Sequence, residues 1–298
     1  MAIINKAKLD AANHNYRALF FKALESNPSQ LYDLAIQFMM EMESSGQVET
    51  YNWLGDVPSV SEWIGDRVLG DLRDSDMSIR NKEWSTGVKM LYADIEDDKL
   101  GQIVPRIQGM AEAFKRFVHT NLVSLIVAGN STACYDGQNF FSASHSEGLS
   151  GTQSNYDAAN SLSSTNFRTA RAQMIELKND RGELLGINPT HLWCASALEG
   201  TAREICLAEY SSAGAQNMDK GLCQPIVIPG ITSTKWGLAD LSKILKPFIK
   251  QNRRPVSFTS MDKADDANFF MRREVYYGAD WRGNFGYGFW QTMYMGHA

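Results

Sequence analysis

Apolar residues recur every three to five positions between residues 103 and 125, with polar residues between them. This spacing places the apolar side chains on one face of a helix. Gly129 and Asn130 form a stop signal, so the sequence predicts a helix of about 25 residues within residues 101–128, roughly 38 Å long. A helix of this length is expected to lie across a sheet as a spine. Its apolar positions are Ile103, Ile107, Met110, Phe114, Phe117, Leu122 and Leu125.

Two shorter apolar stripes, at residues 19–24 and 31–39, predict two helices near the N-terminus. Pro28 separates them, and Ser29 is placed to cap the second helix. Helices this short need a surface on which to pack. The sequence leaves two alternatives open: an arm that docks on another molecule, or helices that pack on their own domain.

Residues 50–95 change from helical spacing to a weak alternation that is typical of strands. The pattern predicts an extended two-stranded ribbon with a loop near residues 70–78. Because an isolated ribbon is barely stable in water, its tryptophans are expected to need contacts with a partner subunit. These tryptophans are Trp53, Trp63 and Trp84.

A strand with two very different faces is predicted near residue 287. Phe285, Tyr287 and Phe289 share one face of such a strand, and Gly286 and Gly288 share the other. Glycine weakens a strand, and its usual reason there is close approach by another backbone or a ligand. We therefore expect packing on one face and close approach on the other.

The second half of the chain alternates between helical and strand patterns. Helices are predicted at residues 165–178 and 197–210, and strands at residues 191–195 and 223–228. A stretch rich in glycine, serine and asparagine at residues 211–221 is expected to be a surface loop. The sequence therefore predicts an α+β protein whose second half is an α/β region.

Composition fits an ordinary globular protein of 298 residues, with 44% hydrophobic and 21% charged residues. The longest apolar runs are too short to span a bilayer. The first residues lack the apolar core of a signal peptide, so we expect a soluble protein made and kept in a cytoplasm. The formal net charge of -5 argues against tight binding to nucleic acid.

Metal-binding motifs are weak in this sequence. The four cysteines include no Cys-x-x-Cys pair, and no two of the five histidines are four residues apart. We expect free cysteines in a reducing compartment. Residues 94–98 hold four acids. These acids suit either a metal site or the start of a helix, and the helix start is the better interpretation because no calcium-type loop follows.

Cys134, Asp136 and His145 admit two interpretations. They could be the nucleophile, orienting group and base of a hydrolase, or they could belong to a structural turn at Asp136-Gly137. No nucleophile elbow, oxyanion loop or phosphate-binding glycine motif accompanies them. The turn is therefore favoured, and the sequence predicts no catalytic residue, no cofactor and no metal site.

Several blocks of sequence, in order, resemble the major head (capsid) subunits of Mu-like phages and prophages. The block Cys-Tyr-Asp-Gly-Gln-Asn-Phe-Phe with the histidine after it is the most specific. One departure is Ser146, where the family often has proline. The similar blocks are residues 52–56, 62–67, 81–84, 94–101, 134–141 with His145, 246–249 and 286–291.

The resemblance implies the Hong Kong 97 phage capsid fold. Its parts would be an N-terminal arm at residues 1–48, an extended E-loop hairpin at 49–93 and a peripheral domain with the spine helix at 94–160. An axial domain at 161–250 and return strands at 251–298 would complete the chain.

The resemblance also implies the function: a major capsid protein that forms pentamers and hexamers of the icosahedral head around double-stranded DNA. Implied partners are further copies of the chain, a scaffold protein, a portal protein, a decoration protein and DNA held by weak contacts, with no membrane. The implied place is the virion, after assembly in the bacterial cytoplasm. A shell protein of an encapsulin-like nanocompartment is the alternative, and the hydrolase using Cys134 and His145 is a remote one.

We expect the contacts between subunits to include Trp53, Trp63, Arg67 and Trp84. Tryptophan is enriched among the residues that dominate binding energy at interfaces. The opposing interpretation is that these tryptophans pack within their own chain.

Overall fold

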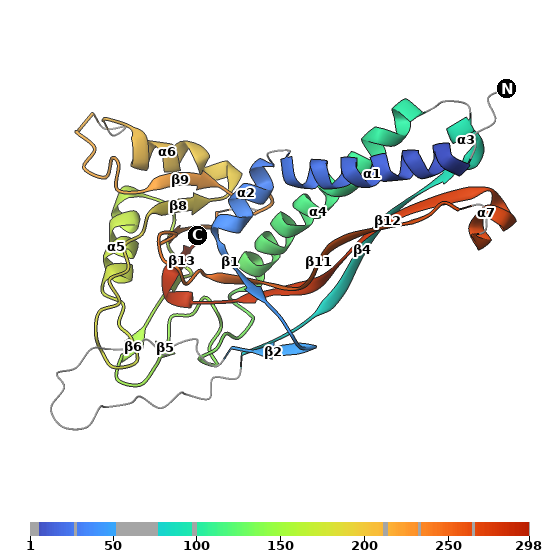
Figure 1. The fold of residues 1–298 in the computed structure, drawn as a ribbon. Helices are drawn as coiled ribbons and strands as arrows, with labels where there is room; N and C mark the ends of the chain where they lie inside the picture. Colours follow the sequence, from blue (N-terminus) through green and yellow to red (C-terminus); the bar gives the residue numbers. More distant parts are fainter. Residues whose placement is uncertain are drawn as a thin grey trace, which may run out of the picture.

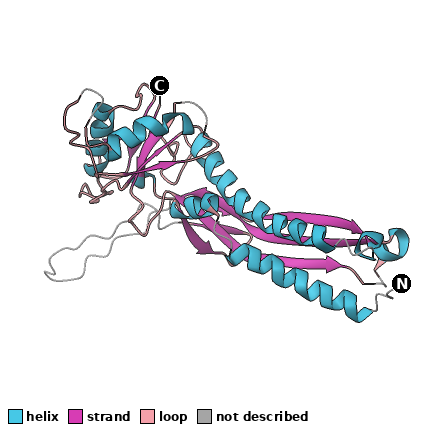
Figure 2. Ribbon diagram, turned by 90° about the horizontal axis from the view of Figure 1, so that it is seen from above, coloured by secondary structure: helices cyan, strands magenta, loops and turns pink. Residues whose placement is uncertain are grey.

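The computed structural model describes residues 6–26, 29–51, 77–96, 100–210, 214–231, 234–263 and 266–297. They form an α+β structure with two sheets, as predicted. One sheet is long, and helices run along it; the other is short and lies in a compact unit at one end (Figures 1 and 2). None of the helices within the described residues has the length and apolar run needed to cross a membrane.

The predicted spine is the helix α4 (Leu100–Ala128), which ends just before Gly129 as the stop signal indicated. The helix α1 (Lys6–Ser26) packs along it, with Phe20 fully buried. Lys115 of α4 donates a hydrogen bond from Nζ to the carbonyl oxygen of Ala23, at 2.7 Å. In the described part of the chain, the N-terminal helices thus pack on their own chain, which favours the second of the two alternatives.

The helix α2 (Gln30–Gln37) begins after Ser29, as predicted, although the Ser29 side chain makes no capping hydrogen bond. This helix is shorter than the sequence suggested. Met39, which the pattern placed in the helix, instead begins the strand β1 (Met39–Glu43). Pairing with the long sheet outweighs the helical spacing at this position.

The long sheet has the order β1-β11-β12-β4. Its central strands β11 (Phe248–Met261) and β12 (Glu274–Tyr287) are antiparallel neighbours, and α7 (Ala267–Arg272) joins them at the far end (Figure 1). From Val275 to Phe285, every second residue of β12 is buried. That face packs against α4, as the contacts of Phe117 with Trp281 and Phe285 show.

Only the two ends of the predicted ribbon lie within the described residues. The strand β4 (Lys82–Leu91) forms where alternation was seen, but its partner among the described residues is β12, with Trp84 opposite Trp281. Among the described residues of this region, a two-stranded pair is formed by β2 (Val48–Thr50) and β3 (Ser78–Arg80). Residues 52–76 of the proposed hairpin lie outside the described part of the chain. Burial of Trp84 against the long sheet accounts for the different pairing of β4.

The compact unit contains the predicted α/β region. Its sheet has the order β7-β13-β10-β8-β9, and β8 (His191–Cys194) and β9 (Gln224–Val227) match the two predicted strands. The helices α5 (Ser164–Ile175) and α6 (Glu199–Leu207) match the two predicted helices. The remaining elements are α3 (Tyr92–Glu96), β5 (His145–Ser146), β6 (Thr152–Gln153), β7 (Tyr156–Asp157), η1 (Ser196–Leu198), β10 (Trp236–Ala239), η2 (Trp290–Thr292) and β13 (Met293–Gly296).

The close approach at the glycines near residue 287 is confirmed, but the strand ends at Tyr287, so Gly288 and Phe289 lie beyond it. A Cβ atom on Gly286 would collide with Ile79, and one on Gly288 would lie 2.5 Å from the carbonyl oxygen of Lys246. On the aromatic side, the Tyr287 ring stacks on Phe140 with 4.8 Å between centroids. The glycines are therefore explained by close approach within the chain itself.

Two glycines of β12 provide a matched test of this packing. We expect Gly283→Ala to destabilise the subunit by about 1–3 kcal/mol, because its Cβ would overlap the carbonyl oxygen of Gln251 and the Trp281 ring. Gly278→Ala should be close to neutral, since its nearest neighbour would be Thr259 Oγ1 at 3.5 Å. Urea unfolding of both variants measures the difference, and equal stabilities would contradict this account.

Candidate functional site

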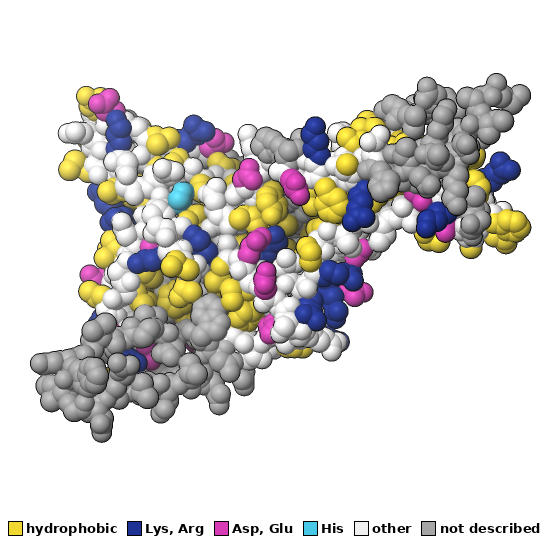
Figure 3. Space-filling model, in the orientation of Figure 1, with side chains coloured by type: hydrophobic (Ala, Val, Ile, Leu, Met, Phe, Trp, Pro, Cys, Tyr) yellow, Lys and Arg dark blue, Asp and Glu magenta, His cyan; other side chains and the backbone are white. Residues whose placement is uncertain are grey.

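Exposed apolar side chains gather at the far end of the long sheet, where Figure 3 shows hydrophobic atoms on the surface. Phe270 and Met271 of α7 are 83% and 74% exposed. We call this group the tip patch, and it consists of Leu91, Met261, Phe270 and Met271. Large apolar side chains grouped at one end of a protein usually mark a contact with another protein.

Trp84 lies on β4, at the outer edge of the described sheet. Its ring is half-buried, with a centroid 4.6 Å from that of Phe117, and its Nε1 donates a hydrogen bond to the carbonyl oxygen of Gly283 at 3.1 Å. Trp84 therefore makes contacts within its own chain, and its role between subunits stays a prediction. Trp53, Trp63 and Arg67, the other predicted contacts, lie outside the described residues.

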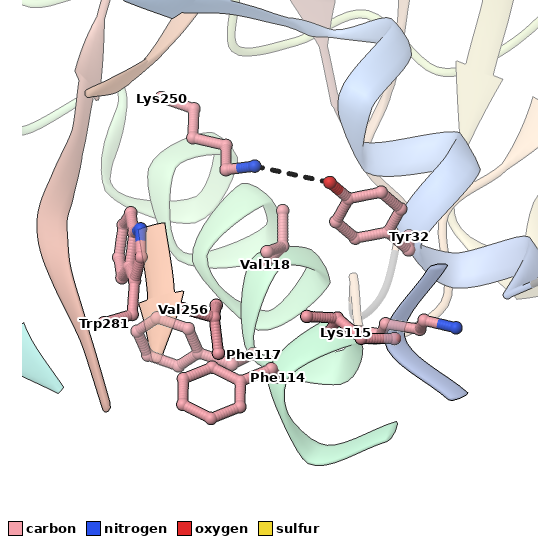
Figure 4. Close-up of a pocket in the computed structure, with 9 residues that line it drawn as sticks. Tyr32, Phe114, Lys115, Phe117, Val118, Lys250, Val256 and Trp281 are labelled. Carbon is pink, nitrogen blue, oxygen red and sulfur yellow. Dashed lines mark hydrogen bonds between the residues drawn. The ribbon is translucent and has the colours of Figure 1, made fainter. Parts of the chain in front are cut away.

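A small cavity of about 110 Å³ lies between α4 and the long sheet (Figure 4). Phe114, Trp281 and other apolar side chains form its walls, and Lys250 lies at its edge. The Lys250 ammonium is 2.5 Å from Glu41 Oε1 and 3.3 Å from the Tyr32 hydroxyl. Since binding pockets for cofactors usually exceed about 300 Å³, this cavity is a gap in the core with a paired cation beside it.

The structure does bring Cys134, Asp136 and His145 together, deep in the protein. The Cys134 thiol donates to Asp136 Oδ1 at 3.0 Å, and His145 Nδ1 lies 2.5 Å from Asp136 Oδ2. His145 Nε2 lies 3.1 Å from Asn155 Oδ1. The imidazole ring stacks on Trp290, with 3.8 Å between centroids and 5° between planes.

These surroundings argue against the hydrolase alternative. A cysteine nucleophile needs a lowered pKa, whereas burial and the neighbouring Asp136 carboxylate raise the pKa of the Cys134 thiol far above its ordinary value. The carboxylate accepts a hydrogen bond from the thiol itself. The favoured interpretation as a turn holds: the Gly137 amide bonds to the Cys134 carbonyl oxygen at 3.1 Å, and Gly137 has a φ of 80°.

A second polar group lies beside this cluster and was not noticed in the sequence. Glu147 Oε1 accepts hydrogen bonds from Trp290 Nε1 at 2.8 Å and from Gln291 Nε2 at 3.3 Å. The Tyr135 hydroxyl lies 2.8 Å from the same oxygen and 2.9 Å from Gln291 Oε1. One hydroxyl hydrogen cannot serve both acceptors, so a proton on Glu147 completes the network.

The two carboxyl groups differ in the direction of their pKa shifts. Burial by itself would raise the pKa of Asp136, but the hydrogen bonds from His145 and Cys134 outweigh burial and lower it. Burial raises the pKa of Glu147 and exceeds the opposing hydrogen bonds from Trp290 and Tyr135. Asp136 is therefore held as the carboxylate, while Glu147 favours the neutral acid.

This contrast predicts opposite responses to amide substitution. The pKa of Asp136 is lowered in the folded protein, so this side chain contributes stability at pH values above its unfolded pKa of about 3.9. That stability is lost as the pH falls through the folded pKa. At pH 7, Asp136→Asn should therefore cost about 2 kcal/mol or more, because a buried partner of His145 is lost. A raised pKa means that Glu147 contributes stability below the unfolded pKa of about 4.3, lost as pH rises through the folded value.

Glu147→Gln should accordingly be neutral or stabilising at pH 7, because the amide carries no charge to bury. Denaturant unfolding of both variants between pH 4 and pH 8 measures the effect. A Glu147→Gln variant that loses as much stability as Asp136→Asn at pH 7 would overturn the assignment.

Comparison with known proteins agrees with the resemblance seen in the sequence. A family model described as "Mu-like prophage major head subunit gpT" matches residues 9–161, 147–231 and 227–298. The chain is 30% identical to the Mu-like prophage FluMu major head subunit of Haemophilus influenzae over 279 residues. This alignment covers 94% of the chain and 68% of the relative.

The chain is also 27% identical to the major capsid protein of Escherichia phage Mu over 289 residues, which covers 97% of the chain and 73% of that protein. Among solved structures, it is similar to a chain of the procapsid of bacteriophage JBD30. The TM-score is 0.62 at 29% identity, over 99% of this chain and 76% of that one.

Proposed function

This chain belongs to the family of Mu-like prophage major head subunits, and from that premise we propose that its copies close the phage head as pentamers and hexamers. The protein is a capsid subunit and not an enzyme. The family match favours a phage head over a nanocompartment shell. In a closed shell, the same surface meets slightly different neighbours, and many weak contacts together stabilise the assembly.

The order of the elements fits the five parts of the capsid fold. We assign residues 1–48 as the N-terminal arm, 49–93 as the E-loop hairpin and 94–160 as the peripheral domain around α4. We assign residues 161–250 as the axial domain and 251–298 as the return strands. The support is the order of elements: a long helix along a thin sheet, then a compact unit with its own sheet.

We propose that copies of the chain contact one another through the tip patch, at the end of the long sheet. Phe270 and Met271 project from α7 with little contact to their own chain, so the fold does not need them. The adjacent Phe269 instead packs its ring against Tyr92, with 4.9 Å between centroids. Further proposed contacts lie along the β4 edge and in the proposed hairpin; they are Trp84, Trp53, Trp63 and Arg67.

Further partners follow from the proposed role. A scaffold protein would guide assembly in the bacterial cytoplasm, a portal protein would occupy one vertex, and a decoration protein would bind the finished shell. Double-stranded DNA would lie against the inner face. The net charge of -5 supports only weak, non-specific contact with that DNA.

The tip patch gives the proposal its test. We expect the double variant Phe270→Ser, Met271→Ser to fold normally, since exposed positions rarely change stability by more than about 0.5 kcal/mol. It should yield at least about tenfold fewer shells, because the apolar contact is lost. Circular dichroism measures folding, and electron microscopy with sedimentation counts assembled particles.

Lys89→Ser is the matched control, since Lys89 lies at the same end of the sheet and its side chain is 73% exposed. Its ion pair with Glu274 is 3.5 Å long and exposed, so its loss should leave assembly nearly unchanged. Normal particles from the double variant would show that the tip patch is not a contact.

A further inference from the structure

We propose that Cys134, Asp136 and His145 form a binding site for one divalent transition-metal ion, zinc foremost. The thiol sulfur, a carboxylate oxygen and a ring nitrogen of these residues lie within 4.8 Å of one another. Sulfur, nitrogen and oxygen in one set are the donors that zinc accepts, at about 2.0–2.3 Å each. This inference concerns neither assembly nor catalysis.

Charge balance makes such a site compatible with burial. In a bound site, a thiolate and a carboxylate would offset the two positive charges of Zn²⁺, and a neutral imidazole would supply the third ligand. The ion and its ligands would then carry no net charge, which is the condition for burying an ion.

A hydrogen bond to Asn155 orients the His145 ring, as outer partners orient the histidine ligands of metal sites. Asn155 Nδ2 donates to the carbonyl oxygens of Phe140 and Met293, and its Oδ1 accepts from the Ser142 amide. The orientation of this amide is therefore fixed, and Oδ1 can only accept from His145 Nε2. That leaves Nδ1 as the nitrogen available to a metal, which is how outer partners select the ligating atom.

The loop that carries the other two ligands is equally fixed. The Cys134 amide donates to the Gln138 carbonyl oxygen at 2.7 Å, and the Gln138 amide donates to Asp136 Oδ1 at 3.0 Å. Trp290 covers the flat face of the His145 ring. Donor atoms around tetrahedral zinc lie roughly 3.3–3.8 Å apart. The thiol is 3.0 Å from Asp136 Oδ1 and His145 Nδ1 is 2.5 Å from Oδ2, so an entering ion would have to part both groups from the carboxylate.

One of the three ligands lies beside a groove. Cys134 lines this groove of about 550 Å³ together with Thr132, Leu125 and Tyr287. Water would supply the fourth ligand, which three-ligand zinc sites leave open.

The test uses the full chain after incubation with zinc and removal of free metal. We expect about one zinc per chain by elemental analysis, and at least about tenfold less in Cys134→Ala. Cys206→Ala is the matched control, because Cys206 is a buried cysteine of the compact unit and should leave the zinc content unchanged. Circular dichroism establishes that each variant is folded.

Cobalt gives a second measurement on the unaltered chain, which needs no variant to fold. Bound Co²⁺ should show the near-ultraviolet charge-transfer band of a thiolate ligand, because a ligating thiol is deprotonated. The proposal is overturned if the unaltered chain retains no zinc above the buffer, if Co²⁺ binds without the thiolate band, or if folded Cys134→Ala keeps its zinc.

Discussion

The structure depends on the packing of one face of β12 against α4. Alternate residues of this strand are buried from Val275 to Phe285, and the rings of Trp281 and Phe285 meet Phe117 of the helix. Tyr16 of α1 packs on the same face, with its ring centroid 5.4 Å from that of Tyr277, so α1 and α4 both cover this face of the sheet. This packing explains why aromatic residues and glycines alternate near the end of the strand. The aromatic rings pack on one side, and on the other side Gly286 lies against Ile79 and Gly288 against the carbonyl oxygen of Lys246.

The same strand joins the two sheets. Beyond Tyr287, the chain passes through η2 and enters the second sheet as β13, between β7 and β10. The buried network of Glu147, Tyr135 and Gln291 holds this passage, and the stacked pair of His145 and Trp290 lies beside it. Because buried polar groups must all be satisfied, such a network specifies one geometry at the junction rather than a range. The two units are thus connected by a fixed joint.

Periodicity predicted those elements that have a regular apolar spacing of their own. The spine helix, the helices α5 and α6 and the strands β8 and β9 were all visible because each repeats a simple apolar spacing. The pairing of β4 was not, since its partner β12 lies some 190 residues away and no local pattern encodes that distance. Asp136 and His145 were recognised as a group, but Asn155, Glu147 and Trp290 were not. Their link to the cluster exists only once the loop and the end of β12 are folded together.

The placement of β13 inside its sheet has a consequence for synthesis. A growing chain that has emerged as far as residue 240 already contains β8, β9 and β10, but it lacks the strand that separates β10 from β7. The hydrogen bonding of the compact unit is therefore complete only after residues 293–296 have been synthesised. Until then, β7 and the neighbouring edge of β10 lack their strand partner, so a partly synthesised chain has an incomplete second sheet.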